Sequence, residues 1–164
     1  MAEAYFAGGC FWCITPTFYE AGASRVVSGF SGGAENDPVY AEVKAQKTGH
    51  RETVQVIYDP EKLSYEALCR AFLAGVDPFD GGGQYIDRGR SYTLAAFYTS
   101  QEEKEIITKL LKELAARSGQ EPCVAVEPFT GFYAAEEEHQ DFYLKQPERY
   151  AEEMRQRQAY ADKR

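Results

Sequence analysis

The sequence has few cysteines, no long hydrophobic run and no excess of basic charge. Four cysteines among 164 residues are too few for the disulfide framework of a small secreted domain. No stretch of 18 apolar residues occurs, which argues against a transmembrane helix. The beginning of the chain lacks the positively charged stretch and apolar core of a secretory signal. We therefore expect a cytoplasmic protein whose cysteines are kept reduced.

The charge balance is acidic, with 18 basic and 26 acidic side chains and a net charge of −8. Phosphate binding needs clustered lysine and arginine, so this balance argues against a nucleic-acid partner. Only residues 155–164 lean towards basic charge, and we interpret them as a solvated helix end.

The length suits one domain, which we place at residues 1–164. Short apolar strands alternate with helical patterns along the chain, and the charged tail after residue 136 is expected to be helical. The expected strands are 3–7, 25–31, 53–58, 92–98 and 123–126, and the expected helices are 10–19, 38–46, 64–73 and 100–118. This alternation indicates a layered domain, and its order suits a split βαβ arrangement.

The strongest local motif is GGCFWC at residues 8–13, a Cys-x-x-Cys pair between a short strand and the start of a helix. Amides at a helix N-terminus carry positive partial charge, so we expect the pKa of Cys10 to fall below its free value. Cys10 and Cys13 are three residues apart and share one helix face. They are close enough for a disulfide after local adjustment, which favours redox chemistry.

Other interpretations of this motif stay open. The chain could be a general thiol–disulfide oxidoreductase of the thioredoxin type, or a binding module that uses Phe11, Trp12 and the tyrosines without chemistry. The two cysteines could also be core residues. A structural zinc site needs four ligands, and the remaining candidates form no second close pair: Cys69, Cys123, His50 and His139. We expect Cys69 and Cys123 to be core thiols.

Five further segments, together with GGCFWC, resemble the A-type peptide methionine sulfoxide reductases: VVSGFSGG (26–33), DPVYAEV (37–43), TGHRETVQVIYDP (48–60), GGGQYIDRGRSY (81–92) and EEEHQDFYLKQPERY (136–150). The likeness runs in order from residue 5 to about residue 150. It implies an α+β fold, a two-layer sandwich with a ferredoxin-like core, followed here by an irregular C-terminal segment. It also implies an enzyme that reduces the S epimer of methionine sulfoxide, free or in proteins, repairing oxidative damage. No cofactor is implied, and the expected partner is thioredoxin or a similar dithiol.

The resemblance implies roles for individual residues. Cys10 matches the nucleophile that attacks the sulfoxide sulfur and becomes a sulfenic acid. Glu52 matches the carboxyl that gives the sulfoxide oxygen its proton, for which it needs a raised pKa. The pocket would further hold an aromatic wall, two tyrosines that bind the oxygen and an acidic residue, which are Phe11, Trp12, Tyr40, Tyr92 and Asp87.

Without the resemblance, these residues would be given ordinary structural roles. Glu52 alone would be interpreted as a solvated strand residue, and Asp87 as one half of a surface ion pair with Arg88. We interpret His139 and Asp141 as supporting structure rather than metal ligands.

The chain departs from the commonest family pattern in its recycling residues. Many relatives carry cysteines near the C-terminus, whereas no cysteine follows Cys123 here. This resembles a subgroup with GCFWC, in which Cys13 would resolve the oxidised Cys10 as a disulfide. Phe30 stands where a tyrosine is common, and Val76 where a histidine is common. These departures bear on recycling rather than on the chemical step.

Overall fold

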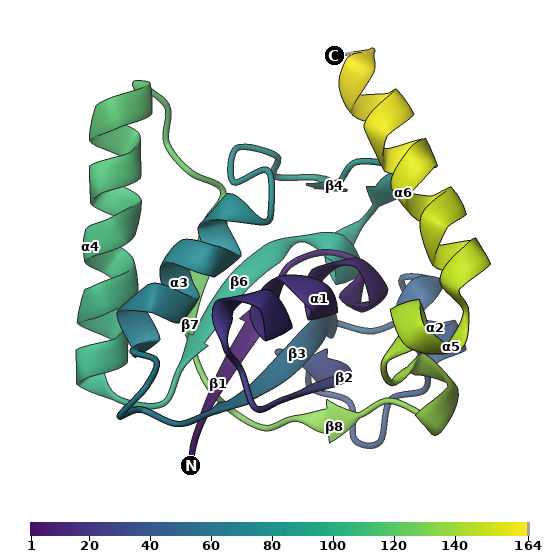
Figure 1. The fold of residues 1–164 in the computed structure, drawn as a ribbon, viewed down its shortest axis with the longest axis horizontal. Helices are drawn as coiled ribbons and strands as arrows, with labels where there is room; N and C mark the ends of the chain where they lie inside the picture. The colour runs from purple at the N-terminus through teal and green to yellow at the C-terminus, as the bar shows by residue number, and fades with distance from the viewer. Residues whose placement is uncertain (164) are drawn as a thin grey trace.

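A computed structural model describes residues 1–163, and Figure 1 shows its helices and strands. In chain order the elements are β1 (Ala2–Ala7), α1 (Phe11–Ala21), β2 (Arg25–Ser31), α2 (Tyr40–Lys44), β3 (Arg51–Tyr58), α3 (Tyr65–Ala74), β4 (Gly83–Gln84), β5 (Asp87–Arg88), the 3₁₀ turn η1 (Arg90–Tyr92), β6 (Leu94–Tyr98), α4 (Gln101–Ser118), β7 (Val124–Pro128), β8 (Tyr133–Ala134), the 3₁₀ turn η2 (Glu137–His139), α5 (Phe142–Lys145) and α6 (Pro147–Asp162).

The main sheet has the strand order β7-β6-β1-β3-β2-β8. Strand β1 is antiparallel to both β3 and β6, and β2 is antiparallel to β3. The four central strands β6-β1-β3-β2, with α1 and α3 as their crossovers, form the ferredoxin-like core, so the predicted split βαβ arrangement is confirmed. Helix α4 then returns the chain to β7, which extends the sheet parallel to β6.

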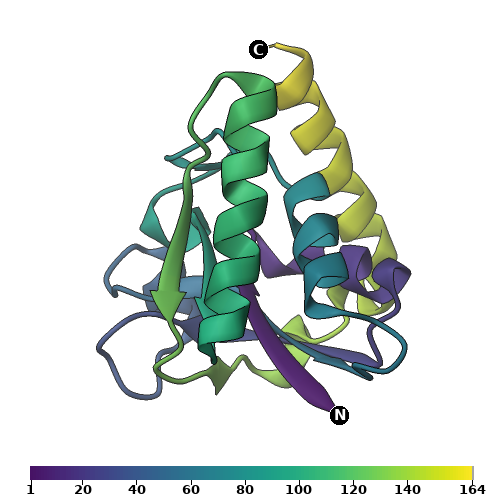
Figure 2. The same cartoon turned by 90° about the vertical axis from the view of Figure 1, so that its left-hand side faces the viewer.

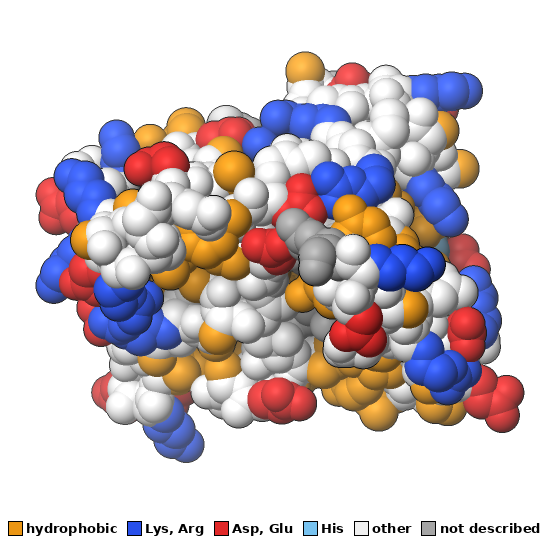
Figure 3. All heavy atoms as spheres, turned by 90° about the horizontal axis from the view of Figure 1, so that it is seen from above, with side chains coloured by type: hydrophobic (Ala, Val, Ile, Leu, Met, Phe, Trp, Pro, Cys, Tyr) orange, Lys and Arg blue, Asp and Glu red, His pale blue; other side chains and the backbone are white. Residues whose placement is uncertain are grey.

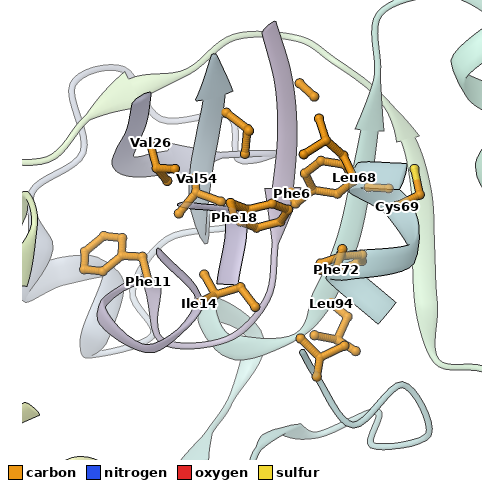
Figure 4. Close-up of a cluster of buried hydrophobic side chains, with 14 of the residues drawn as sticks. Phe6, Phe11, Ile14, Phe18, Val26, Val54, Leu68, Cys69, Phe72 and Leu94 are labelled. Atoms are coloured by element: carbon orange, nitrogen blue, oxygen red, sulfur yellow. The ribbon is translucent and has the colours of Figure 1, made fainter. Parts of the chain in front are cut away.

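Aromatic side chains fill the space between the sheet and the helices α1 and α3 (Figure 4). The ring of Phe6 on β1 lies 5.2 Å from that of Phe18 on α1 and 5.0 Å from that of Phe72 on α3. All three side chains are fully buried, and such aromatic pairs add about 0.5–1.5 kcal/mol each to the burial of their area. This packing fixes α1 on the sheet and therefore fixes its first turn.

Two of the helices begin as their sequences indicate. The hydroxyl oxygen of Ser64 accepts from the backbone N–H of Ala67 at 3.0 Å, and that of Ser100 accepts from Glu103 N–H at 3.2 Å. Ser100 and Glu103 form a capping box with one change. The Glu103 carboxylate accepts from the N–H of Thr99 at 2.7 Å, one residue before the cap.

The opposite face of the sheet is covered by the irregular connection between β7 and β8 rather than by a helix. Tyr5 and Phe97 point to this side, where Phe129 and Phe132 from the β7–β8 connection pack on them. The rings of Tyr5 and Phe129 stack with centroids 3.9 Å apart. The helices are therefore free to lie on one side, where they surround the N-terminus of α1.

The C-terminal region combines irregular and helical structure. Residues 129–146 contain only short elements, and the expected helical tail is present as α6. Figures 1 and 2 show α6 at the edge of the helical layer, where it contacts α1. Figure 3 shows lysine and arginine interspersed with acidic side chains on the face seen from above. Within residues 1–163, no helix combines the length and the apolar character that crossing a membrane requires.

Candidate active site at the start of helix α1

The turn between β1 and α1 places Cys10 at the helix entrance. Cys10 is the N-cap residue of α1, and its carbonyl accepts from the N–H groups of Cys13 and Ile14 at 3.0 and 3.3 Å. Gly9 has φ +85°, and a Cβ there would approach the side chain of Gln84 to 2.8 Å. Only glycine meets both conditions, so the glycine before the cysteine lets the chain turn sharply beneath it.

The two cysteines of the motif lie together. Cys10 and Cys13 form one buried cluster with Tyr92 of η1, and both are free thiols. Their exposed fractions are 6% and 8%, so the pair lies just beneath the surface rather than deep in the core. The prediction that the two residues share one side of α1 is confirmed.

The expected fall in the pKa of Cys10 is wrong for this state of the protein. Its hydrogen bond with Cys13, burial, and the negative charges of Glu52 and Asp87 all raise the pKa of Cys10 well above its ordinary value. Position at a helix N-terminus favours a thiolate, but burial among acidic groups opposes it. The thiol is therefore protonated at neutral pH.

Glu52 on β3 is the most deeply buried carboxyl of the site, with 1% of its surface exposed. One carboxyl oxygen accepts from the N–H of Phe11 at 3.1 Å, next to Cys10, and the other has no hydrogen-bond partner among the described residues. Burial is the largest cause that raises the pKa of Glu52 to about 8; the Phe11 hydrogen bond lowers it, and the charges of Asp87 and Cys13 raise it. Glu52 is therefore a protonated acid at neutral pH, and the solvated-strand interpretation is wrong.

An aromatic stack forms one wall of the site. The Trp12 ring lies on Phe142 with centroids 3.9 Å apart, and its Nε1–H donates to Nδ1 of His139 at 3.2 Å. His139 in turn stacks on Tyr40 at 4.1 Å. Trp12, Tyr40 and His139 line a cavity of about 460 Å³. His139 is thus a supporting residue, as expected, and it acts through the two pocket residues that it touches.

The remaining pocket residues come from three separate segments. Phe11 is fully buried beneath Tyr40, with ring centroids 6.0 Å apart. Tyr40 begins α2 and Tyr92 ends η1. Burial, then the charge of Glu52, raises the pKa of both tyrosines, so their hydroxyls stay protonated and can donate hydrogen bonds.

Asp87 lies close enough to Cys10 and Glu52 for its charge to raise their pKa values, and its partner differs from the one considered in the sequence. Arg88 pairs with Asp80 at 2.6 Å, whereas the Oδ2 atom of Asp87 lies 3.6 Å from Nη1 of Arg157 on α6. Burial and the charge of Glu153 raise the pKa of Asp87 to about 6, although Arg157 lowers it. The surface ion-pair interpretation is therefore wrong.

Helix α6 supplies neighbours that the sequence did not reveal. Residues 155–164 were expected to be a solvated helix end, and most of residues 155–163 are exposed, while Arg164 lies outside the described residues. Arg157 departs from this expectation, because it is only 8% exposed and its guanidinium lies 4.3 Å from the Tyr85 ring centroid. Glu153 and Met154 face the site from the same helix. The three residues share the 3–4 residue spacing of one helix face, which was the available signal. Their opposite charges and low hydropathy masked it.

The two other cysteines lie elsewhere. Cys69 on α3 is buried, as expected, and burial raises its pKa to about 12. Cys123 was expected in the core of a strand, but it is exposed because β7 begins one residue later, at Val124. Among residues 1–163, no three His, Cys, Asp or Glu side chains group as metal ligands.

Known proteins share this sequence and fold. Residues 2–164 match the family model described as peptide methionine sulfoxide reductase. The chain is 44% identical over 155 residues to peptide methionine sulfoxide reductase MsrA of Streptococcus pyogenes serotype M5, covering 93% of this chain and 92% of that protein. It is 41% identical over 165 aligned positions to MsrA of Streptococcus agalactiae, covering 99% and 98%.

Solved structures agree with these matches. The reduced form of Mxr1 from Saccharomyces cerevisiae superposes with a TM-score of 0.84 at 27% identity, covering 90% of this chain and 86% of that one. Mxr1 in complex with Trx2 gives 0.55 at 18% identity, covering 86% and 84%, a likeness that concerns the fold alone. On the family match and the identity to the streptococcal proteins, the chain belongs to the peptide methionine sulfoxide reductase family.

Proposed function

We propose that Cys10, Glu52 and Cys13 carry out the thiol-dependent reduction of methionine sulfoxide, the activity that this chain has as a member of its family. The observation that carries this proposal is the state of Glu52. A buried carboxyl with a pKa of about 8 and one unpartnered oxygen, held by the amide next to Cys10, is a proton donor at neutral pH. We further propose, from the family resemblance, that the S epimer is the substrate.

The first step reduces the substrate. The Cys10 sulfur attacks the sulfoxide sulfur while Glu52 protonates the sulfoxide oxygen and the hydroxyls of Tyr40 and Tyr92 donate hydrogen bonds to it. The oxygen passes to Cys10, which becomes a sulfenic acid, methionine leaves, and the proton of the Cys10 thiol returns to the Glu52 carboxylate. Phe11 and Trp12 supply the aromatic wall for the methyl group, and Asp87 completes the polar side of the pocket. Substrate entry separates Cys10 from Cys13, which removes the hydrogen bond that is the largest cause of its raised pKa.

The second step resolves the sulfenic acid. Cys13 attacks it, water leaves, and a Cys10–Cys13 disulfide forms. An external dithiol then reduces this disulfide. We propose thioredoxin for this role, because Mxr1 has been solved in complex with Trx2 and has the same fold. A reducing, cytoplasmic compartment fits four free cysteines, and the match over residues 2–164 supports a single domain.

A single-turnover experiment tests the cysteine assignment. Reduced protein is mixed with separated epimers of methionine sulfoxide without reductant, and methionine release and disulfides are measured by mass spectrometry. We expect one methionine per chain from the S epimer and a Cys10–Cys13 bond. Cys10→Ser must abolish the reaction, and Cys123→Ser, at the exposed cysteine, is the matched control that must not. A disulfide to Cys69 or Cys123 would overturn the assignment of Cys13.

Reduction of insulin by the same preparation separates the thioredoxin-type alternative from this proposal. Such an oxidoreductase would reduce insulin disulfides with dithiothreitol and leave both sulfoxide epimers unchanged. An aromatic binding module would do neither.

A further inference from the structure

Helix α6 lies across the cysteine pair. Tyr150, Met154 and Arg157 follow each other at helical spacing on its inner face, and with Cys13 of α1 they line a cavity of about 330 Å³. Figures 1 and 2 place the two helices side by side. Because α6 covers this side, Cys10 and Cys13 are nearly buried, and the side chain that α6 sets against them is of particular interest.

That side chain is a methionine. Met154 packs against the cluster of Cys10, Cys13 and Tyr92, together with Trp12. It is only partly buried, since it also borders the cavity between α1 and α6. A small oxidant that enters this cavity therefore meets the thioether beside Cys13, against the cluster that also holds Cys10.

The chain has one other methionine, which serves as a natural comparison. Met1 is 76% exposed at the start of β1. Figure 1 shows the N-terminus at the end of the molecule opposite to α6. An oxidised Met1 can therefore be reduced only by the active site of another molecule.

We infer that Met154 is an internal substrate of this enzyme: when a peroxide oxidises its thioether, Cys10 of the same chain reduces the sulfoxide. This inference rests on the proposed roles of Cys10 and Cys13. The sulfur–oxygen bond of Met154 sulfoxide breaks, the sulfur–sulfur bond of Cys10 and Cys13 forms, and the oxygen leaves as water with the two thiol protons. The cysteine pair loses the two electrons that Met154 gains.

The contact favours this reaction in two ways. A sulfoxide held against the cluster that contains the nucleophile does not have to be bound from solution, so its reduction is intramolecular and does not depend on protein concentration. Oxidation also makes the side chain polar, which weakens its packing on the cysteine cluster. Reduction restores an apolar contact, and the helix that closes the site is thereby kept in place.

The experiment compares the two methionines in one sample. One turnover with free methionine sulfoxide first closes the Cys10–Cys13 disulfide, which protects these thiols while hydrogen peroxide oxidises Met1 and Met154. After the peroxide is removed, dithiothreitol starts the reaction. The sulfoxide content of the two peptides is followed by mass spectrometry at two protein concentrations about 100-fold apart.

We expect the S-epimer share of Met154 sulfoxide to disappear at the same rate in both samples. The rate for Met1 sulfoxide should fall about 100-fold in the dilute sample, because that reaction is bimolecular. Oxidised, isotope-labelled Cys10→Ser protein mixed with wild type reports the purely intermolecular rate for both residues. Its Met154 sulfoxide must therefore depend on wild-type concentration.

Two results would overturn the inference while leaving the proposed function intact. Met154 sulfoxide could follow the concentration dependence of Met1, or it could persist while the same sample reduces added free methionine sulfoxide. If the free sulfoxide is not reduced either, the proposed function itself fails, and the inference fails with it.

Discussion

Replacing Glu52 with glutamine should stabilise the protein and disable it at the same time. Burial shifts the pKa of this carboxyl from its ordinary value of 4.5 to about 8, so the folded protein holds a proton that the unfolded chain releases. An acid whose pKa is raised by folding does not lower the free energy of unfolding below pH 4.5. It lowers that free energy by an amount that grows as the pH rises from 4.5 to 8. At pH 7 this amount is about 3 kcal/mol, and near pH 9 it levels off at about 5 kcal/mol.

Glutamine removes the titration and keeps the shape. Its side-chain oxygen can still accept from the N–H of Phe11. The free energy of unfolding, measured with urea under reducing conditions at pH 4, 7 and 9, should therefore exceed that of the wild type by a margin that widens with pH. The margin should grow by about 3 kcal/mol between pH 4 and 7. Glu61→Gln, at an exposed turn, is the matched control and should show no such widening.

Activity should change in the opposite direction. Loss of a general acid costs about 10²–10⁴-fold in rate, so Glu52→Gln should lower methionine sulfoxide turnover by at least about 100-fold. Wild-type turnover should also fall as the pH rises above about 8, where Glu52 loses its proton. A stability difference that is constant from pH 4 to 9 would refute the reasoning about burial, and undiminished turnover would remove Glu52 from the acid role.

Three further changes test the resolving step, the aromatic wall and the core. Cys13→Ser should still release one methionine per chain but leave a sulfenic acid on Cys10, visible by mass spectrometry after trapping with dimedone; a disulfide to another cysteine would contradict this. His139→Phe keeps the stack but removes the acceptor for Trp12 Nε1–H, so KM for methionine sulfoxide should rise about fivefold, from a loss of about 1 kcal/mol; an unchanged KM would show that the bond does not position Trp12. Leu68→Ala, at a fully buried core position, should lower the free energy of unfolding by about 2–5 kcal/mol in urea titrations. A loss under about 1 kcal/mol would mean that the core collapses into the space that the leucine leaves.

Local patterns in the sequence were sufficient to predict the elements of the core. Each central strand and each crossover helix has its own signal, such as the alternation over Arg51–Tyr58 and the serine cap before α4. The GGCFWC motif likewise predicted both cysteines at the start of a helix, because glycine conformation and helix spacing are short-range properties. That Glu52, Tyr40, Tyr92 and Asp87 lie close enough for their charges to act on one another could be expected only from the family resemblance.

Only the tertiary structure determines the electrostatics of the site and the packing of α6 over it. The pKa of Cys10 depends on its hydrogen bond with Cys13, on its burial, and on two acidic groups, Glu52 of β3 and Asp87 of β5. The pairing of Asp87 with Arg157 rather than Arg88 joins residues 70 positions apart. Sequence by itself determined which segments form strands and helices, because those preferences act over a few residues. Burial and long-range charge pairing, and with them the contact of Met154 with the cysteines, exist only once the chain has folded.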